Sequence, residues 1–145
     1  MANALHVHLA QGGVQVVNDW ADANPRGWLD LSDADLEELQ LSAITVWRGA
    51  ETMSILVPNL DFADFRGARL AYANFSGAQL RGACFVGADL TGAAFTGACL
   101  VAADFSEARL GDTDFVSATV DRCRFPRAAR ESVTNPYLRG APVWV

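Results

Sequence analysis

Residues 63–125 read ADFRGARLAYANFSGAQLRGACFVGADLTGAAFTGACLVAADFSEARLGDTDFVSATVDRCRF, and this stretch counts in fives. A large apolar residue recurs at every fifth position. These thirteen positions are Phe65, Leu70, Phe75, Leu80, Phe85, Leu90, Phe95, Leu100, Phe105, Leu110, Phe115, Val120 and Phe125. The residue two places before each is small: it is Ala at eleven of the thirteen places, with Thr113 and Cys123 as exceptions. A repeat with a fixed period is the strongest indication of the fold in this sequence.

A period of five matches neither a helix nor a straight strand. Five residues of α-helix turn through about 500°, so the apolar residues would not share one face. A strand needs a period of two. The pattern therefore indicates a chain that turns a corner after every five residues and points the small and the large residue inward. Glycines stand two places after many of the large residues, where a corner favours a permissive backbone. They are Gly67, Gly77, Gly82, Gly87, Gly92 and Gly97.

The alternation of Phe and Leu predicts four sides in each coil. With 20 residues a coil, Phe65 and Phe85 fall in one column, Phe75 and Phe95 in the opposite one, and Leu in the other two. Every layer then has a similar volume, as close packing requires. Coils stacked at about 4.8 Å also bring the rings within the favourable range for aromatic pairs. A triangular coil would mix Phe and Leu in every column.

The quintets ADLTG (88–92), ANFSG (73–77) and ARLGD (108–112) resemble those of the pentapeptide-repeat family. The resemblance covers residues 58–125 and implies an all-β solenoid, the right-handed quadrilateral β-helix. The family motif is Ala, then Asp or Asn, then Leu. This chain places Phe at alternate centres and varies the middle position with Arg69, Gln79, Cys84 and Ala94. Since the middle position is expected to face solvent, these departures leave the predicted fold unchanged.

Residues 1–28 are predicted to form a capping segment. Leu5–Leu9 alternates and is weakly typical of a strand, whereas Val14, Val17 and Ala21 have helical spacing that Asn24-Pro25 would end. The alternative is a hairpin that pairs residues 5–9 with 14–17 across the two glycines. The family resemblance favours the helix, which would cover an open sheet edge before the first coil.

Residues 29–125 are predicted to form about five coils. Leu31, Leu36, Leu41 and Val46 resume the count of five, and a one-residue slip near 48–52 would place Ile55 and Leu60 in the later register. A capped helix over residues 32–41 is the alternative, because Ser32 is a possible N-cap with acids in the first turn.

Residues 126–145 form the third predicted unit, a C-terminal cap or tail. The pattern of five stops at Pro126, RAARES is compatible with a short helix, and the remainder is expected to be irregular. Its apolar residues, Tyr137 and residues 143–145, are expected either to cap the last coil or to meet a partner.

Composition narrows the classes of function. The 145 residues carry 17 acids and 11 basic residues, all Arg, for a net charge of −6. Nothing resembles a basic nucleic-acid footprint, so direct nucleic-acid binding is not expected. No apolar run approaches the roughly 20 residues of a membrane span, and the N-terminus lacks signal-peptide features. We expect a cytoplasmic protein without membrane contact.

The sequence offers no convergent chemistry, so we expect neither an enzyme nor a cofactor or metal site. His6 and His8 are expected to be solvated strand residues, because a zinc site would need further ligands. Three Cys without paired spacing fit a reducing compartment. Cys123 takes an inward position, and Cys84 and Cys99 take outward ones.

The remaining candidates for a functional site are features of the surface. The square coil predicts an outward column of Arg69, Asp89 and Arg109, and another in which Cys84 lies between Asp64 and Asp104. Exposed aromatic residues are the candidate partner contacts, since such side chains anchor interfaces. They are Trp47, Phe62, Tyr72, Tyr137 and Trp144.

Three functions fit these features. The first is a non-enzymatic binding or scaffold module with an unidentified protein partner. The second is implied by the family, some members of which resemble DNA, bind type II topoisomerases such as gyrase and confer quinolone or toxin resistance. That role requires a long acidic rod, whereas residues 58–125 hold eight acids and six Arg. A homodimer would lengthen the rod. The third is an accessory or immunity protein of an effector or toxin system.

Overall fold

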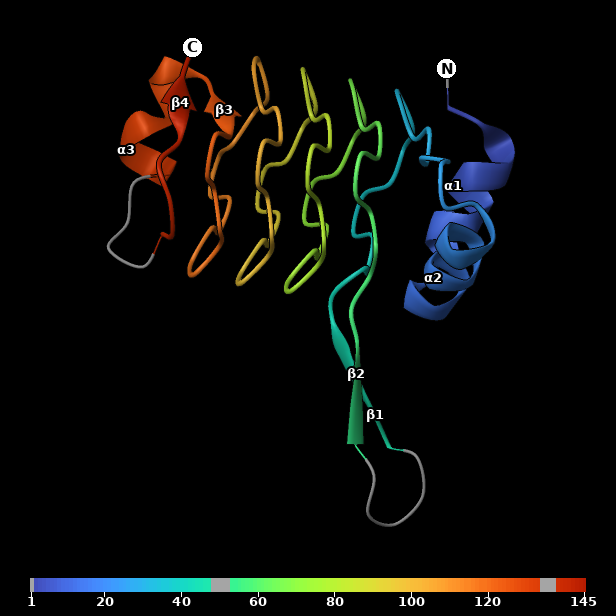
Figure 1. Cartoon of the computed structure of the whole chain (residues 1–145). Helices are drawn as coiled ribbons and strands as arrows, with labels where there is room; N and C mark the ends of the chain where they lie inside the picture. The colour runs from blue at the N-terminus through green and yellow to red at the C-terminus, as the bar shows by residue number, and fades with distance from the viewer. Residues whose placement is uncertain (1, 48–52, 134–137) are drawn as a thin grey trace.

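The computed structural model describes residues 2–47, 53–133 and 138–145, with side chains described outside residues 44–54 (Figure 1). Two helices precede a stack of coils, a hairpin leaves the first coil, and a short helical segment follows the last. The elements are α1 (Ala4–Gln11), α2 (Val14–Ala23), β1 (Ile44–Trp47), β2 (Met53–Leu56), β3 (Arg124–Phe125), the 3-10 helix η1 (Arg127–Ala129), α3 (Arg130–Val133) and β4 (Val143–Trp144).

Parallel bridges between residues 20 apart hold the coils together. Asn59 pairs with Gln79, Asp64 with Cys84, Arg69 with Asp89, and Asn74 with Ala94, so each coil has four bridged sides. On one side, the N–H of Leu70 donates to the carbonyl of Asp89 at 2.8 Å, and the N–H of Asp89 donates to that of Ala68 at 3.0 Å. Because a side is only five residues long, it forms an isolated bridge rather than an extended strand. The 20-residue spacing agrees with the sequence pattern.

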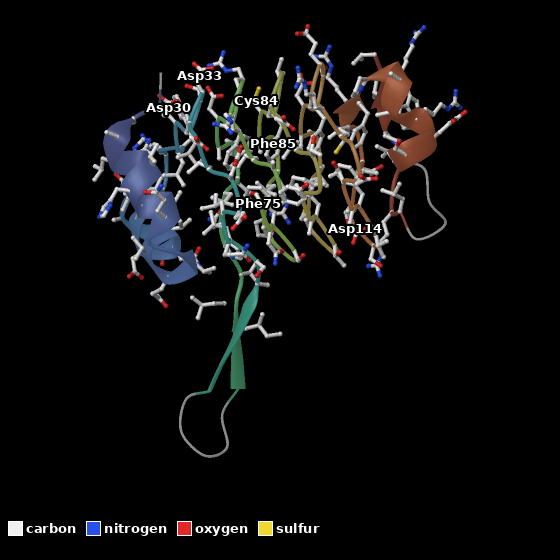
Figure 2. The ribbon with its side chains drawn as sticks, turned by 180° about the vertical axis from the view of Figure 1, so that it is seen from behind. Asp30, Asp33, Phe75, Cys84, Phe85 and Asp114 are labelled. Atoms are coloured by element: carbon white, nitrogen blue, oxygen red, sulfur yellow. The ribbon has the colours of Figure 1, made fainter. Side chains whose placement is uncertain are left out.

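The interior consists of stacked rings and leucines. All thirteen repeat centres from Phe65 to Phe125 are buried, and Figure 2 shows Phe75 and Phe85 inside the coil. Phe65 and Phe85 stack with ring centroids 4.8 Å apart, and Phe75 and Phe95 stack at 5.2 Å. Rings of the two columns meet edge to face, as Phe85 and Phe95 do at 5.6 Å. Both geometries are favourable for aromatic pairs.

The Asp or Asn of the repeat stabilises the corner that follows it. The Oδ1 atom of Asp104 accepts the backbone N–H of Ser106 at 2.9 Å, and Oδ1 of Asn74 accepts that of Ser76 at 3.0 Å. The corner residue itself has a left-handed backbone, with φ of 70° at Gly77, where glycine carries no steric cost. The middle position is therefore structural, since its side chain accepts a backbone N–H of the corner. Most side chains at this position are half-buried.

A hairpin interrupts the first coil, which corrects the register predicted between Val46 and Ile55. Asp30, Asp35 and Gln40 each pair with a residue 34 positions later, 14 more than in the other coils. The extra residues hold strands β1 and β2, which pair antiparallel and project from the coil (Figure 1). Ile55, expected inside, is 63% exposed and lies opposite Thr45. The slip proposed at residues 48–52 lies outside the described residues. The predicted coil over residues 31–41 forms, and its helical alternative does not.

The N-terminal segment is two helices, so the prediction of a strand over Leu5–Leu9 is wrong and that of a helix from Val14 is correct. Helix α1 begins because Oδ1 of Asn3 accepts the N–H of Leu5 at 3.0 Å, an N-cap that outweighs the alternating pattern. Buried residues of both helices, Ala10 and Val17 among them, join the core of the first coil. The helices thus cover one open end of the stack.

The C-terminal segment continues the stack instead of ending irregularly. Arg139 bridges to Thr119, and strand β4 lies parallel to β3 with Trp144 opposite Phe125. The Trp144 ring extends the phenylalanine column, with its centroid 5.8 Å from that of Phe125. Within the described part of the tail, Arg139 and strand β4 therefore cap the last coil. Tyr137 lies outside the described residues.

Replacing Leu90 with Lys should unfold the coil. Leu90 is fully buried, so Leu90→Lys places an unpaired charge inside and should lower the free energy of unfolding by more than about 4 kcal/mol. Ala94→Lys is the matched control, because Ala94 occupies an outward position between Asn74 and Asp114 and should change stability by less than about 0.5 kcal/mol. Urea unfolding followed by circular dichroism tests both. Equal tolerance of the two substitutions would contradict the inward assignment.

Removing the 14 inserted residues should leave the stack intact. The variant lacks residues 44–57 and carries Ala43→Gly and Pro58→Ala. Its sequence across the junction is then SGANL, from Ser42 to Leu60, and the 20-residue period is restored. The melting temperature should change by less than about 5 °C. Deleting residues 44–56 with the same two substitutions leaves one residue too many and should destabilise the first coil by several kcal/mol, because its buried leucines each contribute about 1.5–3 kcal/mol. Equal melting temperatures would refute the register.

Candidate interaction surfaces

The structure places Phe62 and Tyr72 at two corners of one coil. Both have a left-handed backbone, with φ of 63° and 59°, and both are largely exposed, at 66% and 65%. Each ring lies over the glycine of the next coil: a Cβ atom on Gly82 would come within 2.7 Å of the Phe62 ring, and one on Gly92 within 2.6 Å of Tyr72. Because the two corners are ten residues apart in a 20-residue coil, they lie on opposite edges and form no common site.

Trp28 is an exposed aromatic residue that the sequence reasoning missed. It lies 34 positions before Phe62, the spacing that the bridges give between the first and second coils. The two residues therefore belong to one corner column, and Trp28 is 59% exposed. The signal was hidden because the count of five gave no indication of a 14-residue insertion.

A cleft opens beside this corner, between the end of helix α2 and the first coils. Its volume is about 210 Å³. Three aromatic rings and several polar groups line it, among them Trp20, Asn24, Trp28, Asn59, Asp61 and Phe62. The Trp20 ring approaches Gly27 so closely that a Cβ there would be 3.1 Å from its Cη2 atom. The absence of a side chain at Gly27 thus allows the loop to fold over the helix.

A second hollow shares Trp20 and Trp28 with the first and also includes His6 and Asp30. Figure 2 shows Asp30 close to the N-terminal helices. The backbone N–H of Asp30 donates to Nδ1 of His6 at 2.9 Å, and the His6 and Trp20 rings meet edge to face at 5.1 Å. His6 is thus a docking residue of helix α1 and not the solvated strand residue that the sequence suggested. His8 is exposed on the same helix.

The hairpin is anchored at its base by helix α2. The side-chain amide of Asn18 donates to the carbonyl of Val57 at 2.9 Å, and its Oδ1 atom accepts the N–H of Asn59 at 2.9 Å. Strands β1 and β2 contain no charged residue and form a sheet of two strands only. Trp47 ends β1, and its side chain lies outside the part that is described. The hairpin base and the aromatic cleft are both in contact with α2, so they lie at the same end of the molecule.

Ion pairs run along the outer columns of the coil. Arg69 contacts Asp35 at 2.9 Å and also Glu37, Arg109 lies 3.9 Å from Asp89, and the two residues of each pair come from successive coils. The Asp64–Cys84–Asp104 column also forms. Hydrogen bonds from the Arg66 side chain lower the pKa of Asp64, and those from the hydroxyl and N–H of Thr91 lower the pKa of Asp89.

Trp144 is part of the C-terminal cap, and its role as a partner contact stays a prediction. It is half-buried, packs against the core and lies 5.8 Å from the guanidinium carbon of Arg130. Cys123 is buried, and burial raises the pKa of its thiol to about 12, so this thiol is unreactive. Cys84 and Cys99 are half-buried on outward positions.

Among the residues with described placement, no three His, Cys, Asp or Glu side chains converge in a way that would hold a metal ion. No described helix is both long and apolar enough to span a bilayer.

Residues 59–97 and 88–127 match the model of the pentapeptide-repeat family, with eight copies of the repeat. Residues 59–127 are therefore a run of pentapeptide repeats, and such repeats imply a right-handed β-helix. No curated protein matches the sequence.

Several solved structures are similar to this chain. Alr5209, a pentapeptide repeat protein from Nostoc PCC 7120, is 20% identical over 89% of this chain and 96% of its own, with a TM-score of 0.58. HetL from the same strain, a pentapeptide repeat protein involved in heterocyst differentiation regulation, is 25% identical over 77% of this chain and 43% of its own, with a TM-score of 0.48. QnrB1, a plasmid-mediated fluoroquinolone resistance protein, is 16% identical over 75% and 64%, with a TM-score of 0.36. The first similarity supports the fold alone, and the other two do not bear on this chain's function.

Asp89→Ala should destabilise the coil at neutral pH and have little effect in acid. Oδ1 of Asp89 accepts hydrogen bonds from the hydroxyl of Thr91 at 2.7 Å and from its N–H at 3.1 Å, so their loss should cost about 1 kcal/mol at pH 7. Since the pKa of Asp89 is lowered in the folded state, its contribution is present above the ordinary value of 3.8 and is lost as the pH falls through the folded-state pKa. Urea unfolding at pH 7 and at about pH 2 measures both. An equal loss of stability at the two pH values would contradict this account.

Proposed function

We propose that this chain is a non-enzymatic protein–protein interaction module. In this proposal a four-sided, right-handed β-helix of about five coils is the rigid frame, and the hairpin β1–β2 is the arm that a protein partner binds. The observation that carries the proposal is the insertion: bridge spacing rises from 20 to 34 residues at one corner, and strands β1 and β2 of the inserted segment project away from the frame (Figure 1).

The hairpin has the properties of a binding element. Its strands, ITVW and MSIL, are mostly apolar. The Ile55 side chain is 63% exposed. A two-stranded hairpin is marginally stable alone in water, and its outer edges offer backbone groups for pairing. A partner that covers these strands would stabilise them. The anchor through Asn18 holds the base in place against α2.

The charge arrangement makes the DNA-like role the weaker candidate. Five of the six Arg residues between 58 and 125 contact an acidic side chain, so the coil does not carry a continuous acidic surface. Binding to a type II topoisomerase, an accessory or immunity role, a homodimer and a cytoplasmic location stay predictions from the sequence. The experiment below distinguishes the first two by the identity of the captured protein.

Capture of the partner should depend on the hairpin. The tagged chain and the variant that lacks residues 44–57, with Ala43→Gly and Pro58→Ala, are used as baits in the native host, followed by mass spectrometry. One stoichiometric protein should be captured by the intact chain and reduced at least about tenfold with the variant, since most binding energy resides in a few residues. Equal capture by both baits would contradict the role of the hairpin. Recovery of gyrase subunits would favour the DNA-like role, and recovery of a cognate effector or toxin would favour the accessory role.

A further inference from the structure

We propose that the cleft lined by Trp20, Trp28 and Phe62 binds a cationic side chain, the guanidinium of an arginine, and that the arginine belongs to the protein partner. The second half of this inference rests on the proposed function. The first half concerns only the chemistry of the cleft, and it is tested without the partner.

Aromatic faces supply the first part of the attraction. Trp28 is 59% and Phe62 is 66% exposed, and both line the cleft, whereas most other large side chains of the frame are buried. One side of the Phe62 ring lies against Gly82, whose missing side chain leaves room for the ring. Cations are attracted to such ring faces, and indole is the strongest of the natural side chains in this respect.

Carboxylates supply the second part. Asp61 lines the cleft, and Asp30 lines the neighbouring hollow on Trp28. Asp61 also accepts the N–H of Arg81 at 2.8 Å and lies 3.5 Å from its guanidinium, so its charge is partly compensated. None of the residues that line either hollow, all of them within the described part of the chain, is Arg or Lys. The net charge of −6 further favours the approach of a cation.

The size and polar lining select an arginine side chain. The cleft volume of about 210 Å³ is smaller than the roughly 300–1,000 Å³ typical of sites for whole small molecules, so a single side chain suits it better. A guanidinium is planar, stacks on aromatic rings and presents several donors in a fork. Asp61 and the side-chain oxygen of Asn59 are acceptors in the same lining. A lysine ammonium is more strongly hydrated and does not stack, so we expect it to bind more weakly.

The probe for this site is N-acetyl-arginine amide, with N-acetyl-norleucine amide as the uncharged control. Titration into ¹⁵N-labelled protein should shift the indole N–H signals of Trp20 and Trp28 with millimolar affinity, and the signal of Trp144 should stay in place. The shift should shrink with added salt, because part of the attraction is electrostatic. Equal shifts with the norleucine compound would show a merely apolar hollow and overturn the proposal.

Two glycine substitutions form a matched pair. Phe62→Gly and Tyr72→Gly each remove a ring that lies over a glycine, and each relieves a left-handed backbone, so both variants should fold at least as well as the parent. Phe62→Gly should weaken arginine-amide binding at least about fivefold, and Tyr72→Gly should leave it unchanged. Unchanged binding in the Phe62→Gly variant would overturn the assignment of the cleft. This result is independent of the hairpin deletion, so failure of one proposal is distinguishable from failure of the other.

Discussion

Stacking between successive coils is the constraint on which the rest of the structure depends. Phe65, Phe85 and Phe105 stack at 4.8 Å, close to the spacing of hydrogen-bonded strands, so ring contacts and backbone bridges are satisfied by one rise per coil. A segment inserted into a coil must therefore begin and end at the same corner, so that the sides of the coil keep their stacking. The hairpin meets this condition. Its 14 residues lie between the corner residue Ala43 and the next side of the coil. The N–H of Ala43 donates to the carbonyl of Ser76, as expected for a corner residue.

The sequence predicts the regular part of the molecule well because one period determines both which residues are buried and which residues are neighbours. The pairs Phe65–Phe85 and Asp64–Cys84 follow from counting alone. The period of five predicted the wrong structure for Val46 and Ile55. Their spacing differs from the repeat by one residue, but both residues belong to the hairpin β1–β2. Local pattern cannot separate these cases, since an apolar residue suits either structure.

The surface was less predictable than the core for a similar reason. Phe62 was recognisable as a corner residue, but its neighbour Trp28 was not, because their relation depends on the length of the insertion. The alternation of Leu5–Leu9 suggested a strand, whereas the Asn3 cap and packing against the first coil favour a helix. The result is an asymmetric molecule. Paired charges cover the sides, while the hairpin base and the aromatic cleft meet at the end covered by α2.

Residue-resolved amide hydrogen exchange tests most directly whether the coil is the rigid frame and the hairpin an appended arm. Amides that bridge the central coils, such as those of Leu70 and Phe85, should exchange only through global unfolding, because their bonds lie between packed layers. Amides of β1 and β2 should exchange faster by orders of magnitude, through local opening. Hairpin amides as strongly protected as those of the central coils would contradict this account, since they would show that the hairpin folds as one unit with the frame.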